Sequence, residues 1–358
     1  MLLAIPGVAQ DIAFVSDRDG LDDIFVMDFR HGSTPVKLTS MKSGQVFCPS
    51  WTPDGKSIIY YYLAEADENS AVYTVDVNGG DPQRIAPLPG IYYPGNRLSL
   101  SPDGLRLLYE SRSRILICAV GDSLPVDLGE GYYPTWTHDG RIMFTRQAPD
   151  RLFVMNSDGS SITQIDLAPP DVQCYGYLAE DGTCQPFLFL LWELIGAPPS
   201  YIETATAVIK RARITWSSPS PNGYLIAVVY FLDVSYPEII SYYGRFIVFD
   251  TARNRPVPLA GVSSEFTDAG HGSERGPTNT AACFPSWSPD GSRLAFTEYR
   301  HGNFDIVTIN ADGTVYTNLT NHPANDWQPV WAPKSIRTST TSCSWGKLKS
   351  TALSDTCR

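Results

Sequence analysis

The sequence lacks any long apolar run that would cross a membrane. Its most hydrophobic stretch, residues 186–195, contains Glu193 and is shorter than the roughly 18 uncharged residues that a membrane span needs. Positive charge is also scarce, since 27 Lys and Arg stand against 38 Asp and Glu and leave a net charge of -11. Such a molecule is repelled by nucleic-acid phosphates and by anionic membranes. We therefore expect a soluble protein without a membrane span and without a nucleic-acid partner.

The common sequence signals of catalysis are missing as well. The chain contains no Gly-x-Ser-x-Gly elbow, no His-Glu-x-x-His helix, no P-loop and no dinucleotide-binding glycine fingerprint. Its five histidines are not paired at ligand spacing, although distant residues can still converge at a channel mouth. The acidic segment 17–23 does not fit the EF-hand spacing, and its counterpart at 299–305 indicates a recurrent hairpin turn. The sequence predicts no catalytic residue, no metal site and no cofactor.

Cysteine is too rare to supply a disulfide framework, with seven residues in a chain of 358. Two closely spaced pairs, Cys174 with Cys184 and Cys343 with Cys357, are candidates for small disulfide-closed loops. The alternative is free buried thiols, which suits Cys118 best because it lies in an apolar segment. Residues 1–10 are apolar and end in small residues, much like the end of a secretory signal. This segment favours an extracellular or periplasmic location.

What the sequence has instead is one short phrase, repeated along the chain. The phrase is an aromatic residue, Ser or Thr, Pro, Asp and Gly. It stands at residues 51–55 and 287–291, and residues 136–140 have His in place of Pro. Degenerate copies occupy residues 100–104 and 219–223, and a half-copy at 329–333 ends before the turn. Periods of about 40 to 50 residues are typical of repeat architectures such as propellers.

Each copy of the phrase predicts a tight turn between two strands. Pro presets the backbone angle, Asp or Asn bonds to the amides of the turn, and Gly adopts the positive φ that the turn needs. The turn residues are Asp54, Gly55, Asp103, Gly104, Asp139, Gly140, Asn222, Gly223, Asp290 and Gly291. A β-rich segment follows each turn, such as residues 57–62, and a third strand and a short fourth come next. Four antiparallel strands per unit predict a propeller blade.

The two ends of the repeat region complete each other. Residues 12–15 have the pattern of a second strand without a phrase before it, whereas residues 329–333 offer a first strand with nothing after it. Joining them ties the ends together non-locally. The predicted fold class is all-β: a six-bladed β-propeller with four antiparallel strands per blade, closed by N-terminal strands plus a C-terminal strand.

The phrase, followed by an Ile-Ala-Phe type strand and an Asp-Ile-Phe-Val-Met-Asp type strand, resembles the TolB-like propeller family. The resemblance covers about residues 11–333. It is specific for the architecture and poorly specific for function. It implies a docking platform for complexes of the cell envelope.

Two segments depart from the repeat. The first is an insertion at about residues 167–213, which contains an apolar run and is either packed on its own propeller or a partner-binding surface. Its candidate partner-binding residues are Phe187, Phe189, Leu191, Trp192 and Tyr201. The second is the Ser/Thr-rich tail, residues 334–358, a tether, linker or disordered segment.

Together these features predict a non-catalytic exported propeller. We expect it to act as a protein-binding or self-assembling scaffold, with a protein partner or copies of itself held by rim loops and the 167–213 insertion. Two alternatives stay open. One is a propeller enzyme of lyase or hydrolase type with a site at the channel mouth, and the other is a cell-surface module that binds a glycan through clustered aromatic side chains.

Overall fold

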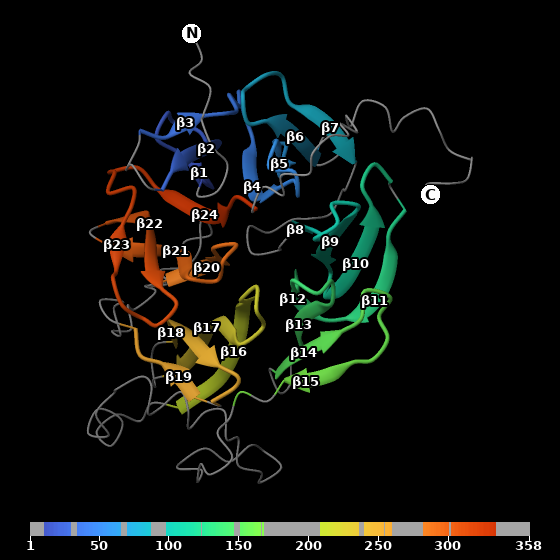
Figure 1. The fold of residues 1–358 in the computed structure, drawn as a ribbon, viewed down its shortest axis with the longest axis vertical. Helices are drawn as coiled ribbons and strands as arrows, with labels where there is room; N and C mark the ends of the chain where they lie inside the picture. Colours follow the sequence, from blue (N-terminus) through green and yellow to red (C-terminus); the bar gives the residue numbers. More distant parts are fainter. Residues whose placement is uncertain are drawn as a thin grey trace.

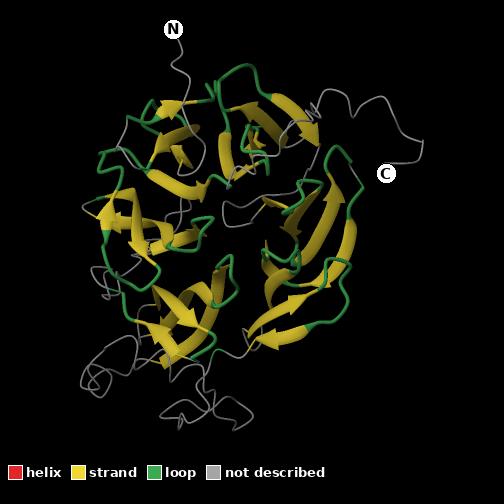
Figure 2. Ribbon diagram, in the orientation of Figure 1, coloured by secondary structure: helices red, strands yellow, loops and turns green. Residues whose placement is uncertain are grey.

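The computed structural model describes residues 11–29, 34–65, 70–86, 98–122, 124–146, 151–165, 167, 208–235, 240–253, 255–259, 282–300 and 302–333. These residues form six four-stranded sheets in a ring, without a helix (Figures 1 and 2). The prediction of an all-β, six-bladed propeller is confirmed. The described part of the chain has no helix with the length and apolar character of a membrane span.

Each blade runs from an inner strand at the centre of the ring to an outer strand, and each pair of neighbouring strands is antiparallel. Listed from the inner to the outer strand, blade 1 is β24 (Asp326–Trp331), β1 (Asp11–Ser16), β2 (Asp23–Asp28) and β3 (Val36–Lys37), and blade 2 is β4 (Gln45–Trp51), β5 (Ser57–Leu63), β6 (Ala71–Asp76) and β7 (Gln83–Ala86). Blade 3 is β8 (Leu98–Leu100), β9 (Arg106–Ser111), β10 (Arg114–Ala119) and β11 (Val126–Glu130), and blade 4 is β12 (Tyr132–Trp136), β13 (Ile142–Arg146), β14 (Arg151–Met155) and β15 (Thr163–Ile165). Blade 5 is β16 (Val208–Pro219), β17 (Leu225–Ser235), β18 (Ile240–Asp250) and β19 (Arg255–Val257), and blade 6 is β20 (Ala282–Trp287), β21 (Arg293–Arg300), β22 (Asn303–Asn310) and β23 (Thr317–Asn318).

The core lies between neighbouring blades. Second strands are buried on both faces, as in β1, where all six residues are buried, so their central residues form a continuous apolar run rather than an alternating pattern. Tryptophans of the phrase join adjacent blades: Trp51 Nε1 donates to the carbonyl of Val330 at 3.1 Å, and Trp287 Nε1 donates to that of Ser218 at 2.9 Å. Blades 2 and 6 are thereby tied to the inner strand of the blade before each of them.

The two ends of the described chain close the ring in blade 1. Strand β24 pairs with β1, with Ile12 opposite Trp331 and Ser16 opposite Asp326. Beyond the strand, the amide of Ala332 donates to the carbonyl of Asp11 at 2.8 Å. This closure by N-terminal strands plus a C-terminal strand confirms the prediction made from the two half-blades.

The Asp-Gly turns all lie on one face of the ring, which we call the turn face. It carries the connections between first and second strands and between third and fourth strands. The five turn glycines have φ between 68° and 80°, and the preceding side chain accepts hydrogen bonds within the turn. Asp54 Oδ1, for example, accepts from Thr52 Oγ1 at 2.6 Å and from the amide of Lys56 at 3.1 Å. The opposite face, with the second-to-third hairpins and the connections between blades, is the loop face.

Blade 5 is longer than its neighbours. Its second and third strands pair at eleven positions, against six in blade 1, and five extra rows at about 3.4 Å each amount to about 17 Å. The added rows, together with the start of β16, form the blade 5 extension on the loop face, residues 208–213, 231–235 and 240–244. Residues 208–213 therefore belong to strand β16 and not to the insertion, because pairing with β17 extends the strand through a basic stretch.

Candidate functional site

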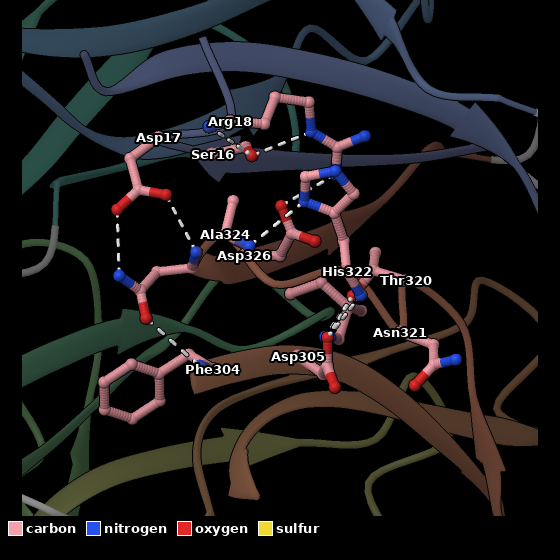
Figure 3. Close-up of polar contacts among 12 residues, drawn as sticks. Ser16, Asp17, Arg18, Phe304, Asp305, Thr320, Asn321, His322, Ala324 and Asp326 are labelled. Atoms are coloured by element: carbon pink, nitrogen blue, oxygen red, sulfur yellow. Dashed lines mark hydrogen bonds and ion pairs between the residues drawn. The ribbon is translucent and has the colours of Figure 1, made fainter. Parts of the chain in front are cut away.

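A network of polar side chains fills the loop-face end of the junction between blades 6 and 1 (Figure 3). Its residues come from the hairpin after β1, from the starts of β22 and β24, and from the connection between β23 and β24. This junction is where the ring closes, so the network links segments that are about as far apart in the sequence as the described chain allows.

Arg18 forms the ion pair at the centre of this junction. Its Nη2 donates to Asp326 Oδ1 at 2.8 Å, its Nε donates to Ser16 Oγ at 2.9 Å, and its guanidinium carbon lies 4.9 Å from the ring centre of Phe25. Asp326 is fully buried. Burial raises the pKa of Asp326, and this effect outweighs the opposing one of Arg18. The pair is desolvated and ties the β1 hairpin to β24.

Asn325 adds a second link across the same junction. The carboxylate of Asp17 accepts from the Asn325 amide and from Asn325 Nδ2, each at 2.8 Å. The Asn325 side-chain oxygen in turn accepts from the amide of Phe304 at 3.2 Å. Asn325 therefore joins the β1 hairpin of blade 1 to β22 of blade 6.

Asp305 closes a clamp between the third and fourth strands of blade 6. Its carboxylate accepts from Thr320 Oγ1 at 3.2 Å, from the His322 amide at 3.2 Å and from Asn318 Nδ2 at 2.8 Å.

The same clamp recurs in blade 1. There Asp23 accepts from Thr39 Oγ1 at 2.7 Å and from the Met41 amide at 2.9 Å. Because the arrangement repeats and each carboxylate is occupied by donors of its own blade, we interpret both aspartates as strand clamps and not as acid-base groups.

Asp22 and His322 are ionisable groups that lie next to these clamps in the sequence. Burial, together with the charges of Asp17 and Asp23, raises the pKa of Asp22 to about 6. His322 Nδ1 accepts from the amide of Ala324 at 3.1 Å, which places its remaining proton on Nε2 when the ring is neutral. Within the residues that the structure describes, no group of three or more His, Cys, Asp or Glu is arranged to hold a metal ion.

The inner strands share a strained backbone position. Cys48, Tyr133, Phe284 and Gln328 each precede a proline in β4, β12, β20 and β24, and each has φ between 52° and 55°. The strand register shifts at this position in all four blades, as in a β-bulge. Left-handed non-glycine residues cost energy and persist only where their surroundings hold them.

Side chains of the neighbouring blade hold three of these bulges. The amide of Gln328 donates to Thr297 Oγ1 at 3.0 Å, and the amide of Cys48 donates to Gln328 Oε1 at 2.7 Å. The amide of Tyr133 donates to Glu110 Oε2 at 2.8 Å. The bulges are thus part of the contacts between blades.

The aromatic belt, defined as Phe47, Trp327, Phe284, Trp216 and Tyr133, runs along the inner strands of five consecutive blades. Successive ring centres are 5.8, 6.4, 4.7 and 6.1 Å apart. The first four side chains are at most 8% exposed. The belt therefore packs the inner strands against one another, whereas the glycan-binding alternative needs aromatic faces that are accessible at a channel mouth.

Glu110 is a nearly buried carboxyl group beside this belt. It is 6% exposed, and burial raises its pKa, against the opposing effect of the Tyr133 amide. A carboxyl group in this position binds its proton more tightly than it does in water.

The sequence-predicted site residues fall into two groups. Phe187, Phe189, Leu191, Trp192 and Tyr201 lie outside the described residues, as do Cys174, Cys184, Cys343 and Cys357. The turn residues lie on the turn face.

Cys118, in the described part of the chain, is a buried free thiol, and burial raises its pKa to about 11. The sequence analysis missed the bulges and the aromatic belt of the inner strands, although in four blades a proline two residues before the phrase tryptophan follows directly after the bulge residue.

Comparison with known proteins points to the same architecture. No family model matches the chain. The structure of TolB from Acinetobacter baumannii is similar to it, with a TM-score of 0.56 and 18% sequence identity over 93% of this chain and 69% of that chain. A chain of a nidogen/laminin complex is similar with a TM-score of 0.53 and 10% identity, over 90% of this chain and 98% of that chain. At these identities the likeness concerns the fold alone: the chain is a six-bladed β-propeller that is similar in fold to TolB.

Proposed function

We propose that this chain is a non-catalytic, exported propeller that binds another protein chain, whether a different protein or a further copy of itself, through its loop face. The observation that carries the proposal is the blade 5 extension. The extension lengthens the three paired strands β16, β17 and β18 at their loop-face ends. Its first residue, Val208, directly follows the insertion.

The connectivity brings the insertion to this face. Strand β15 of blade 4 and strand β16 of blade 5 are joined on the loop face, and residues 166–207 lie between them. Both described ends of this segment, Ile165 and Val208, lie on the loop face, and the sequence between them contains the apolar run with Phe189 and Trp192. An apolar surface of this kind has to be covered by protein, and strand edges of an extended sheet are a common route of association.

The junction network supports binding rather than chemistry. Asp23 and Asp305 are saturated by donors of their own blades, and the Arg18 ion pair fixes the β1 hairpin against β24. Rigid presentation lowers the entropy that binding costs. Export is supported by the apolar start of the sequence, residues 1–10.

Light scattering coupled to size-exclusion chromatography tests the proposal. The full chain is compared with a variant in which residues 186–199 are replaced by a Gly/Ser segment of equal length, and with a control in which residues 335–348 are replaced in the same way. In a second experiment, a photo-crosslinking amino acid replaces the residue at position 192, and irradiation of the cells that make the protein captures any chain bound there. We expect one of two results: light scattering shows an assembly that dissociates only in the variant with residues 186–199 replaced, or crosslinking captures a partner chain. A folded monomer of 39.4 kDa that yields no adduct contradicts the proposal.

A further inference from the structure

Exposed apolar side chains gather on the turn face, opposite the proposed loop-face site. Among the described residues, eight large hydrophobic side chains are exposed. Six of them lie in or next to the turns of the turn face: Leu105, Leu124, Val126, Ile162, Tyr224 and Val315. The other two, Leu21 and Val36, belong to the β1 hairpin and to outer strand β3 of blade 1. Single exposed apolar residues are ordinary, but a cluster on one face calls for an explanation.

Four of the six form the turn-face patch, defined as Leu105, Leu124, Val126 and Ile162 on blades 3 and 4. Their exposed fractions are 60%, 78%, 61% and 42%. The two turns of blade 3 that carry these residues are adjacent, because the amide of Val120, at the start of the turn with Leu124, donates to the carbonyl of Leu105 at 2.9 Å.

The turn of blade 4 that carries Ile162 lies next to blade 3. A Cβ at Gly159 would lie 3.5 Å from the Leu128 side chain of β11. The β14–β15 turn, which carries Ile162, is therefore packed against the outer strand of blade 3.

The patch has an acidic border. Its turns contain four carboxylates, Asp103, Asp122, Asp139 and Asp158, and two guanidinium groups, Arg106 and Arg141. Hydroxyl donors of Ser101, Thr137 and Ser160 hold the pKa of Asp103, Asp139 and Asp158 below the usual range. Arg106 and Arg141 are paired with Asp103 and Asp139 at 3.5 and 2.8 Å, and four carboxylates against two guanidinium groups leave the border with an excess of negative charge.

We propose that the turn-face patch is a second docking surface, which accepts a basic amphipathic segment of another polypeptide, with apolar anchors on Leu105, Leu124, Val126 and Ile162 and Lys or Arg beside the acidic turns. Charge complementarity selects this occupant. A second copy of the chain would bring Asp against Asp across the interface, and like charges facing each other cost affinity. The proposal goes beyond the loop-face function and does not depend on it.

The test measures binding of a synthetic amphipathic Lys/Leu helix to the full chain by fluorescence anisotropy, with hydrogen exchange to locate it. A Lys/Ser peptide of equal charge and a Glu/Leu peptide of equal apolar content are the control probes. The variant L124S/V126S removes the two most exposed side chains of the patch. The matched control L21S/V36S removes two exposed apolar side chains elsewhere.

We expect L124S/V126S to weaken Lys/Leu binding by about tenfold or more, because the variant removes apolar surface that the bound segment would bury. The L21S/V36S control should stay within about twofold. Protection from exchange should map to residues 103–106, 119–130 and 157–163, and both control probes should bind more weakly.

Three results would overturn the proposal. They are equal binding by both double variants, Lys/Ser binding as tight as Lys/Leu binding, and a dimer in light scattering that L124S/V126S abolishes, which would make the patch a self-association surface. A second variant, D122N/D158N, keeps the test valid if L124S/V126S misfolds, because it should weaken Lys/Leu binding while leaving the apolar side chains in place.

Discussion

Replacing Gly104 by Ala should destabilise the propeller more than the same change at Gly140. Both glycines occupy the same place in the phrase turn, with φ of +76° and +80°. For either one, a left-handed alanine costs about 1 to 2 kcal/mol. Only at Gly104 does the added Cβ meet a neighbour, because it would lie 2.9 Å from the Cδ and Cγ atoms of Pro53 in the adjacent blade. Relief of such overpacking costs a further ~1 to 3 kcal/mol.

The total loss of unfolding free energy is therefore about 2 to 5 kcal/mol for G104A and about 1 to 2 kcal/mol for G140A. Urea denaturation followed by tryptophan fluorescence measures both variants, and equal m-values in the two variants show that the comparison concerns stability. G140A serves as the matched control for backbone strain. Equal midpoints for the two variants, or a lower midpoint for G140A, would refute the packing of adjacent phrase turns against each other.

Two further predictions concern the junction of blades 6 and 1. R18M should lower the free energy of unfolding by about 3 kcal/mol or more, because it leaves the buried Asp326 carboxylate without its partner. The exposed pair Arg141–Asp139 provides the control, and R141M should lower the free energy of unfolding by less than about 1 kcal/mol. Equal losses for the two variants in urea denaturation would be inconsistent with a desolvated Arg18–Asp326 pair. Asp22 binds its proton more tightly in the folded state, with a pKa raised from 3.8 to about 6, so wild-type stability should fall relative to D22N as the pH rises from about 4 to about 6 and level off above it. A difference between the two proteins that is flat over that interval in thermal unfolding would contradict the burial of Asp22.

The blades could be predicted because their chemistry is local. Each phrase sets a turn within a few residues, as Thr52 and Asp54 do around Gly55, and the strands on either side follow from it. Even the degenerate copy with Leu100 in place of Trp forms inner strand β8. Closure also followed from the sequence, since each end supplied the half of a blade that the other lacked.

The conformation of the inner-strand bulges could not be predicted, because it depends on contacts between blades. The left-handed conformation of Gln328 rests on an acceptor at Thr297, and that of Tyr133 rests on Glu110. Neither partner is close in the sequence. The blade 5 extension was missed for a related reason, because the start of β16 is a strand only through its pairing with β17.

Closure of the ring by β24 is the central claim, since the blade count and the loop-face junction both depend on it. Native-state hydrogen exchange under increasing denaturant tests it most directly, because it separates local opening from global unfolding. We predict that the amides of β24 and of its partner β1 exchange with the same free energy and the same denaturant dependence as those of the interior strands β5 and β21. Exchange of β24 at a clearly lower free energy, with little dependence on denaturant, would show a strand that is only loosely docked and would contradict the closed ring.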